Sequence, residues 1–231
     1  MRYEKKYTFS AEFLDEIRGS LRHSPFVFDD AFSKRRVNTL YLDTIGLENY
    51  RDNLDGVSNR SKVRLRWYTE KGKSYCNESI NFRLEVKLRK NFMGEKIVHK
   101  MDLPNDILRG SSINLINYLI KNSPNHFKPF LTPCSLASLG VCYDREYYQS
   151  RSIDLRCTID SDLKFWDPMD GWLTLNSEFN QASYPMEYGI MEMKFGPEIY
   201  DLISNTPDPL LQKVSSGRHS KYAIGLGIIH R

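Results

Sequence analysis

The sequence predicts an α+β fold built around antiparallel strands that are charged on one face and apolar on the other. The clearest observation is a run of basic residues at every second position from Arg60 to Arg66, with Val63 and Leu65 between them. Because alternate side chains of a strand point to opposite faces, this run is a strand with one cationic face. A second observation is that four more segments repeat the alternation. Two architectures fit: an open sheet with a hydrated outer face, or a closed barrel with a charged interior and helices outside.

The cationic run brings like charges close together. Its members are Arg60, Lys62, Arg64 and Arg66. Neighbouring charges on one strand face lie about 6.6 Å apart. Each adjacent pair repels by about 0.6 kcal/mol in water and by about 2.5 kcal/mol at an effective dielectric constant of about 20. A face that serves only solubility usually mixes both signs of charge, so this face is expected to bind a polyanion.

The four other alternating segments combine many bases with a few carboxylates. Their charged or polar positions are Arg2, Glu4 and Lys6; Arg83, Glu85, Lys87 and Arg89; Arg156, Thr158 and Asp160; and Glu192 and Lys194. For one strand, a hydrated outer face is the ordinary interpretation. Across all five, the excess of bases favours the closed barrel, since larger barrels enclose ligand cavities.

Hydrophobic alternation and turn residues place the strands in chain order. The turn signal Asn53-Leu54-Asp55-Gly56 precedes the cationic strand, and Lys71-Gly72-Lys73 begins the loop that follows it. The expected strands are Tyr3–Phe9, Val37–Asp43, Arg60–Trp67, Phe82–Arg89, Lys96–Leu103, Leu139–Gln149, Asp154–Asp160, Trp172–Leu175 and Met191–Phe195.

Helical periodicity and capping residues predict four helices between these strands. Ser10 is a capping residue for the first helix, which has Ile17 and Leu21 on its apolar side. Pro124 ends the second helix, and Pro197 suits the first turn of the third. The expected helices are Ser10–Arg22, Ser112–Lys121, Pro197–Ile203 and Pro209–Ser215.

Composition limits the possible classes of protein. The chain has 231 residues, of which 40% are hydrophobic, and this suits one domain over residues 1–231. The net charge of +4 is small for a general nucleic-acid coat. Trp67 and Phe82 fall on the face opposite the bases, which argues against a barrel that stacks nucleic-acid bases and against a sequence-specific nucleic-acid partner.

The remaining class signals concern redox state and membranes. No pair of the four cysteines has Cys-x-x-Cys spacing, so reduced thiols in the cytoplasm are expected. The N-terminus is no secretory signal, and no apolar run approaches the roughly 20 residues of a spanning helix. We therefore expect no membrane span.

These charged faces suit a nucleoside triphosphate or a polyphosphate. Arginine binds phosphate oxygens with two parallel hydrogen bonds, and lysine acts as a point charge. Glu192 is the candidate ligand for Mg²⁺ or Mn²⁺, because these ions prefer oxygen ligands. Glu4 and Glu85 either contact the substrate site or orient nearby bases. Phosphoryl transfer needs positioning and charge neutralisation more than a protein nucleophile, so no catalytic triad is required.

A set of short motifs spreads over nearly the whole chain in a fixed order. They are Arg2-Tyr3-Glu4-Lys5-Lys6-Tyr7, Leu40-Tyr41-Leu42-Asp43-Thr44, Arg64-Leu65-Arg66-Trp67-Tyr68, Leu84-Glu85-Val86-Lys87, Tyr143-Asp144-Arg145-Glu146-Tyr147-Tyr148, Arg156-Cys157-Thr158-Ile159-Asp160, Met191-Glu192-Met193-Lys194-Phe195 and Ser220-Lys221-Tyr222. With these motifs the chain resembles the polyphosphate polymerase domain of the vacuolar transporter chaperone (VTC) complex and its bacterial relatives, in the CYTH-like triphosphate tunnel metalloenzyme superfamily.

The resemblance implies a fold, a reaction and a set of contacts. It implies an eight-stranded antiparallel barrel, a tunnel with charged residues inside, and transfer of the γ-phosphoryl group of ATP to a growing polyphosphate chain. Glu192 would bind the metal. The implied phosphate contacts are Lys6, Arg64, Arg66, Lys87, Arg145, Arg156, Lys194 and Lys221. The charge pattern itself adds Arg60, Lys62, Glu4 and Glu85 as substrate-binding candidates.

One position departs from the wider superfamily. Its hydrolases and cyclases often begin with Glu-x-Glu-x-Lys, whereas this chain has Arg2-x-Glu4-x-Lys6. The change removes one acidic metal ligand and adds a base, which favours the polymerase branch. A triphosphatase on the same scaffold and a non-catalytic polyphosphate-binding module remain the alternatives, and the oligomeric state stays open.

Overall fold

The computed structural model describes residues 3–69, 81–91, 93–104, 106–107, 110–168, 183–208, 210–211, 214–217 and 219–230. Several predicted features lie outside the described residues: Arg2, the loop start Lys71-Gly72-Lys73, Cys76, the strand expected at 172–175, and Pro209 at the start of the last expected helix. Cys134, Cys142 and Cys157 are buried cysteines, and none of the three is in a disulfide among the described residues.

The sheet confirms the antiparallel α+β class. Its strands are β1 Tyr3–Ser10, β2 Phe28–Asp43, β3 Asn59–Thr69, β4 Phe82–Lys90, β5 Met93–Met101, β6 Leu136–Ser150, β7 Leu155–Trp166, β8 Tyr184–Pro185, β9 Tyr188–Phe195 and β10 Ser215–Ser216. Hydrogen bonds connect them in the order β10-β1-β9-β7-β6-β2-β3-β4-β5, and β8 pairs with β7. Among the described residues this path begins at β10 and ends at β5. The expected eight-stranded barrel is therefore not closed by their hydrogen bonds.

Helices occupy the connections between strands. They are α1 Leu14–Arg22, α2 Glu48–Leu54, α4 Ser112–Asn122, α5 Lys128–Leu131, α6 Tyr200–Asn205 and α7 Lys221–Ile229, with 3₁₀ turns at Ala11–Phe13, Asn125–Phe127 and Pro197–Ile199. In the part of the chain that the structure describes, no helix has the length and apolar character needed to cross a membrane.

The chain forms two compact units. The first comprises Met1–Arg36, Tyr143–Leu163 and Pro185–His219, and the second comprises Val37–Cys142, Lys164–Tyr184 and Ser220–Arg231. Strands β2, β6 and β7 contribute residues to both units. Each unit has a hydrophobic core of its own. The expectation of one domain over 1–231 stays a prediction.

The first unit packs one face of β1, β9 and β7 against helices. Alternate positions along each strand supply the core, as the period of two requires. Ile17 and Leu21 of α1 and Ile203 of α6 cover this face. The strand residues beneath them are Tyr7, Phe9, Leu155, Cys157, Ile159, Met191, Met193 and Phe195. The opposite face of the same strands carries the charged positions.

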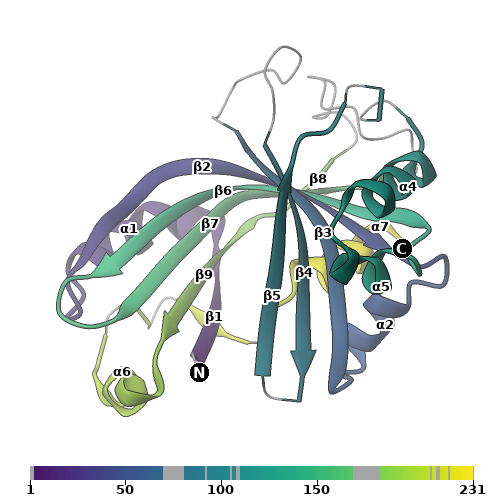
Figure 1. Cartoon of the computed structure of the whole chain (residues 1–231). Helices are drawn as coiled ribbons and strands as arrows, with labels where there is room; N and C mark the ends of the chain where they lie inside the picture. Colours follow the sequence, from purple (N-terminus) through teal and green to yellow (C-terminus); the bar gives the residue numbers. More distant parts are fainter. Residues whose placement is uncertain are drawn as a thin grey trace. The chain divides into compact units, whose positions relative to one another are not determined.

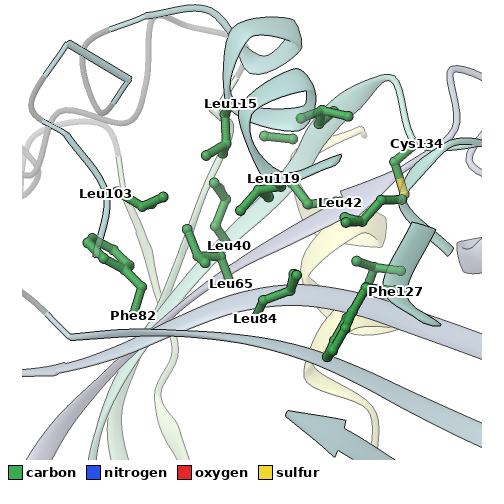
Figure 2. Packing of buried hydrophobic residues seen from close by; sticks show 14 of the residues in the cluster. Leu40, Leu42, Leu65, Phe82, Leu84, Leu103, Leu115, Leu119, Phe127 and Cys134 are labelled. Carbon is green, nitrogen blue, oxygen red and sulfur yellow. The ribbon is translucent and has the colours of Figure 1, made fainter. Parts of the chain in front are cut away.

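The second unit uses the same arrangement on β3, β4 and β5, which lie side by side (Figure 1). Leu65 and Leu84 lie opposite each other across β3 and β4, and both belong to the buried cluster in Figure 2. Leu115 and Leu119 of α4 and Phe127 cover this apolar face. The bases predicted on the cationic strand therefore point away from α4 and Phe127.

Four local details differ from the sequence prediction. Strand β2 begins at Phe28 rather than near Val37. The side chain of Ser10 makes no cap hydrogen bond and donates to Glu12 instead, so the regular helix begins only at Leu14. The expected Pro209–Ser215 helix is wrong at its end, because Ser215 lies in β10. Helix α2 was absent from the prediction.

Helix α7 is a further difference, because no helix was predicted over its residues. Gly225 and Gly227 lower intrinsic helix propensity and hide its pattern. A Cβ atom at Gly225 would lie 2.6 Å from side-chain atoms of Leu139 and Phe165. This close packing of the helix requires glycine there and supplies stability that local propensity lacks.

Candidate functional site

The charged face of the first unit arranges its side chains in cross-strand rows. Glu4 lies opposite Lys194, which in turn lies opposite Arg156. In the next row Lys6 lies opposite Glu192. We call Glu4, Lys6, Arg156, Glu192 and Lys194 the acid–base patch. Residues directly opposite each other in an antiparallel pair point to the same side, so the register brings these five side chains together.

Short ion pairs connect the acid–base patch. Lys6 Nζ lies 2.8 Å from a carboxylate oxygen of Glu4 and 3.8 Å from one of Glu192. Lys194 Nζ lies 2.6 Å from Glu192 and 3.9 Å from Glu4. Lys6 also donates to the carbonyl of His219 at 3.2 Å. The two carboxylates thus share the same two ammonium groups.

Glu192 is ionised although it is buried. Burial by itself raises the pKa of this carboxyl group, but the charges of Lys194, Lys6 and Arg145 outweigh burial and the repulsion from Glu4, so its pKa is lowered. A buried carboxylate that stays charged is a chemically suitable ligand for a hard divalent cation. No group of three or more potential metal-ligating side chains occurs among the described residues. A metal at Glu192 and Glu4 would therefore take its other ligands from phosphate and water, as Mg²⁺ commonly does.

Arg145 has a close acidic partner in the same unit. Its Nε and Nη2 atoms donate to the two carboxylate oxygens of Asp160 at 2.5 and 2.7 Å. Its guanidinium carbon lies 5.2 Å from the ring centre of Tyr143. Burial by itself lowers the pKa of Arg145. The negative charge of Asp160 and the hydrogen bonds to it together outweigh burial, so the pKa is raised. The resemblance implied phosphate contact for Arg145, and that contact stays a prediction.

The charged face of the second unit carries a dense row of bases. Lys62 on β3 lies opposite Lys87 on β4, and Lys87 lies opposite Lys96 on β5. Two positions further along, Arg64 lies opposite Glu85. We call the charged side of these strands, formed by Arg60, Lys62, Arg64, Arg66, Arg83, Glu85, Lys87, Lys96 and Lys100, the basic face. Like charges directly opposite each other destabilise a sheet, so this arrangement is maintained at a cost in stability.

Glu85 is the carboxylate at the centre of the basic face. It is 1% exposed, and its oxygens lie 2.7 Å from Arg64, 3.8 Å from Arg66 and 3.2 Å from Lys96. Burial by itself raises the pKa of Glu85, but the charges of these three bases outweigh burial and lower the pKa to about 2. The expectation that Glu85 orients arginines is consistent with these contacts. Its role toward a substrate stays a prediction.

The N-terminus of helix α7 lies beside the basic face. Ser220 caps the helix, and its hydroxyl accepts a hydrogen bond from Lys62 at 3.0 Å. Lys221 is the first residue of the helix and is partly buried. Arg60 donates to the carbonyl of Val57 at 2.6 Å, at the start of β3.

The register of β4 with β5 reveals basic residues that sequence reasoning did not select. Lys96 contacts Glu85, and Lys100 lies opposite Arg83. The alternation of Lys96 and Lys100 with Ile97 and His99 was visible in the sequence. Only the hairpin register shows that these lysines share a face with Arg64.

Comparisons with known proteins identify a family and two similar folds. The VTC domain family model matches residues 1–230. The PH1819 protein from Pyrococcus horikoshii OT3 is 15% identical to this chain, with a TM-score of 0.51 over 99% of this chain and 100% of that one. The HpAC1 protein from Hippeastrum, described as an adenylyl cyclase candidate with a dominant triphosphatase activity, is 14% identical, with a TM-score of 0.51 over 98% of this chain and 96% of that one.

The similarity to these two solved structures shows a similar fold, whereas the family model matches the sequence itself. A comparison with curated proteins gave no match. The family match extends over the acid–base patch, the basic face and the start of α7. This chain belongs to the VTC domain family.

Proposed function

We propose that this chain is a metal-dependent polyphosphate polymerase that uses ATP. The observation that carries the proposal is the basic face, where Lys62, Lys87 and Lys96 stand in one cross-strand row. Three adjacent ammonium groups repel one another, and a compact chain of phosphates offsets that repulsion better than a monovalent anion. Membership in the VTC domain family supports the same class of substrate.

The proposed reaction is a single phosphoryl transfer. A terminal oxygen of the polyphosphate chain forms a bond to the γ-phosphorus of ATP, and the bond from that phosphorus to the β–γ bridging oxygen breaks, so ADP leaves. Arg64 and Arg66 hold phosphate oxygens with directional hydrogen bonds. The remaining proposed phosphate contacts are Lys6, Arg60, Lys62, Lys87, Arg145, Arg156, Lys194 and Lys221.

A divalent ion, Mn²⁺ or Mg²⁺, fits the donors of the acid–base patch. Bound there, it would neutralise charge on phosphate oxygens. Glu192 is the proposed ligand. Glu4 is connected to it by Lys6, which contacts both carboxylates, and Lys194 also contacts Glu192. Lys6 and Lys194 hold both carboxylates in place and keep Glu192 ionised.

Incubation of the protein with ATP and Mn²⁺ tests the proposal. The expected products are ADP and chains long enough to resolve on a gel. Release of orthophosphate without chains would instead identify a triphosphatase, a function supported by the similarity of the fold to HpAC1. Tight binding of polyphosphate without turnover under any divalent metal would identify a binding module.

A further inference from the structure

The hydroxyl of Ser220 connects three elements of the second unit. It accepts hydrogen bonds from Lys62 on β3 at 3.0 Å, from Asn53 on α2 at 3.2 Å and from the backbone N–H of Ala223 on α7 at 3.3 Å. Lys221 is the next residue in the chain. The position of the α7 N-terminus therefore determines where the Lys62 ammonium group is held. It also determines the position of the Lys221 backbone.

A buried carboxylate behind this hydroxyl organises helix α2. Asp43, at the end of β2, is fully buried. It accepts hydrogen bonds from the backbone N–H groups of Thr44, Asn49 and Tyr50 at 2.8, 3.0 and 3.1 Å. The residue at the cap position of α2, Leu47, has no side-chain cap and a φ of 53°. Asp43 thus replaces the missing cap and satisfies N–H groups of the first turn.

The same carboxylate also binds helix α7. The hydroxyl of Tyr222 donates to Asp43, and it lies 3.1 Å from the hydroxyl of Ser138. Helices α2 and α7 contact each other (Figure 1). One buried anion therefore joins the first turns of two helices that are far apart in the sequence.

The ring of Tyr222 is buried against two other tyrosine rings. The side chain is 1% exposed. Its ring stacks on Tyr41 with centres 4.5 Å apart and meets the edge of Tyr50 at 6.1 Å. Burial, together with the neighbouring Asp43, raises the pKa of Tyr222 far above its ordinary value, so the hydroxyl stays protonated and donates.

We propose that Asp43 and Tyr222 are positioning residues that fix the N-terminus of α7, so that Ser220 holds Lys62 and Lys221 is presented to phosphate groups of the substrate. Neither residue touches the substrate itself. This inference rests on the proposed function, because it assigns to the pair a role in the binding of triphosphate or polyphosphate.

The test compares a variant that removes one hydroxyl with a matched control. Tyr222→Phe keeps the ring and removes the hydrogen bond to Asp43. Ser24→Ala is the control: Ser24 donates to the buried Asp208 at 2.8 Å in the first unit, whereas Asp43 and Tyr222 belong to the second. Calorimetric titration with inorganic tripolyphosphate should show about tenfold weaker binding to Tyr222→Phe. Binding to Ser24→Ala should match the wild type although its stability falls.

A double-mutant cycle separates positioning from general stability. Lys62→Met and Lys221→Met together remove the two proposed phosphate contacts that the α7 N-terminus positions, and each keeps an apolar stem. If Tyr222 acts through the α7 N-terminus, adding Tyr222→Phe to this Lys62→Met, Lys221→Met background should weaken binding by less than about twofold. The full tenfold effect in that background would overturn the proposal, since Tyr222 would then act elsewhere.

Hydrogen exchange supplies a readout that does not depend on the proposed function. Backbone amides of residues 222–225 should exchange faster in Tyr222→Phe and at the wild-type rate in Ser24→Ala. Failure of the wild type to bind tripolyphosphate would refute the proposed function, and exchange would then decide alone whether Tyr222 fixes α7. Unchanged exchange in Tyr222→Phe would overturn the positioning role.

Discussion

Arg145 and Asp160 form a two-pronged ion pair, with Nε–Oδ1 and Nη2–Oδ2 distances of 2.5 and 2.7 Å. Asp160 is 1% exposed, so water screens its electrostatic attraction to Arg145 only weakly. The guanidinium group is held in one orientation before any substrate arrives. This relationship makes Asp160 a structural partner of a proposed phosphate contact.

Asp160→Asn should strongly destabilise the protein. The substitution keeps the shape of the buried side chain at 160 but leaves the partly buried guanidinium group of Arg145 without its charge partner. Such loss typically costs about 3 to 5 kcal/mol. Urea unfolding at neutral pH measures it. Asp29→Asn is the control, because the exposed pair of Asp29 with Arg151 is screened by water, and no measurable change is expected there. Equal effects of the two substitutions would contradict the assignment.

Glu85 should make stability depend on acid. Its folded pKa of about 2 lies below the ordinary value of 4.5, so its contribution is complete above pH 4.5 and is lost as the pH falls toward 2. The shift corresponds to about 3 kcal/mol. Glu85→Gln should therefore be less stable than the wild type at pH 7, and the difference should shrink between pH 4.5 and pH 2. Unfolding free energies at pH 7, 4 and 2.5 test this, and a constant difference would refute it.

Glu192→Gln should weaken the binding of the divalent metal that the proposed reaction needs. The amide keeps the size of the side chain but removes the charge that Lys194 and Lys6 now neutralise. Half-maximal activity should need at least about tenfold more Mn²⁺. Glu12→Gln, at an exposed position of the first unit, is the control. An unchanged Mn²⁺ dependence in Glu192→Gln would remove Glu192 from the metal site.

Arg66→Ala should nearly abolish turnover without unfolding the chain. Arg66 donates to the hydroxyl of Thr39 at 3.3 Å and lies 3.8 Å from Glu85, which keeps Arg64 and Lys96 as closer partners. The melting temperature should therefore change by only a few degrees. Product formation from ATP and a thermal melt measure the two effects. Wild-type turnover in this variant would exclude Arg66 from the site, whereas the exposed Arg22→Ala should remain active.

The sequence predicted the faces of the strands well because a period of two is a local property. Strands β3 and β4 occupy nearly the predicted ranges, and their bases point away from the apolar cluster. Helix α4 matches its predicted range for the same reason, since both its periodicity and its cap at Ser111 are local. Helix α7 was missed because its two glycines lower helix propensity and its stability comes from distant packing partners.

By itself, the sequence determined which side chains are charged, which strand face carries them and to which family the chain belongs. Only the tertiary structure decided which charges meet. The row of Lys62, Lys87 and Lys96 depends on the register of two hairpin pairings. The hydrogen bond from Tyr222 to Asp43 joins residues 179 positions apart. Alternation along a strand follows from backbone geometry, whereas register and long-range contacts follow from the packing of the whole core.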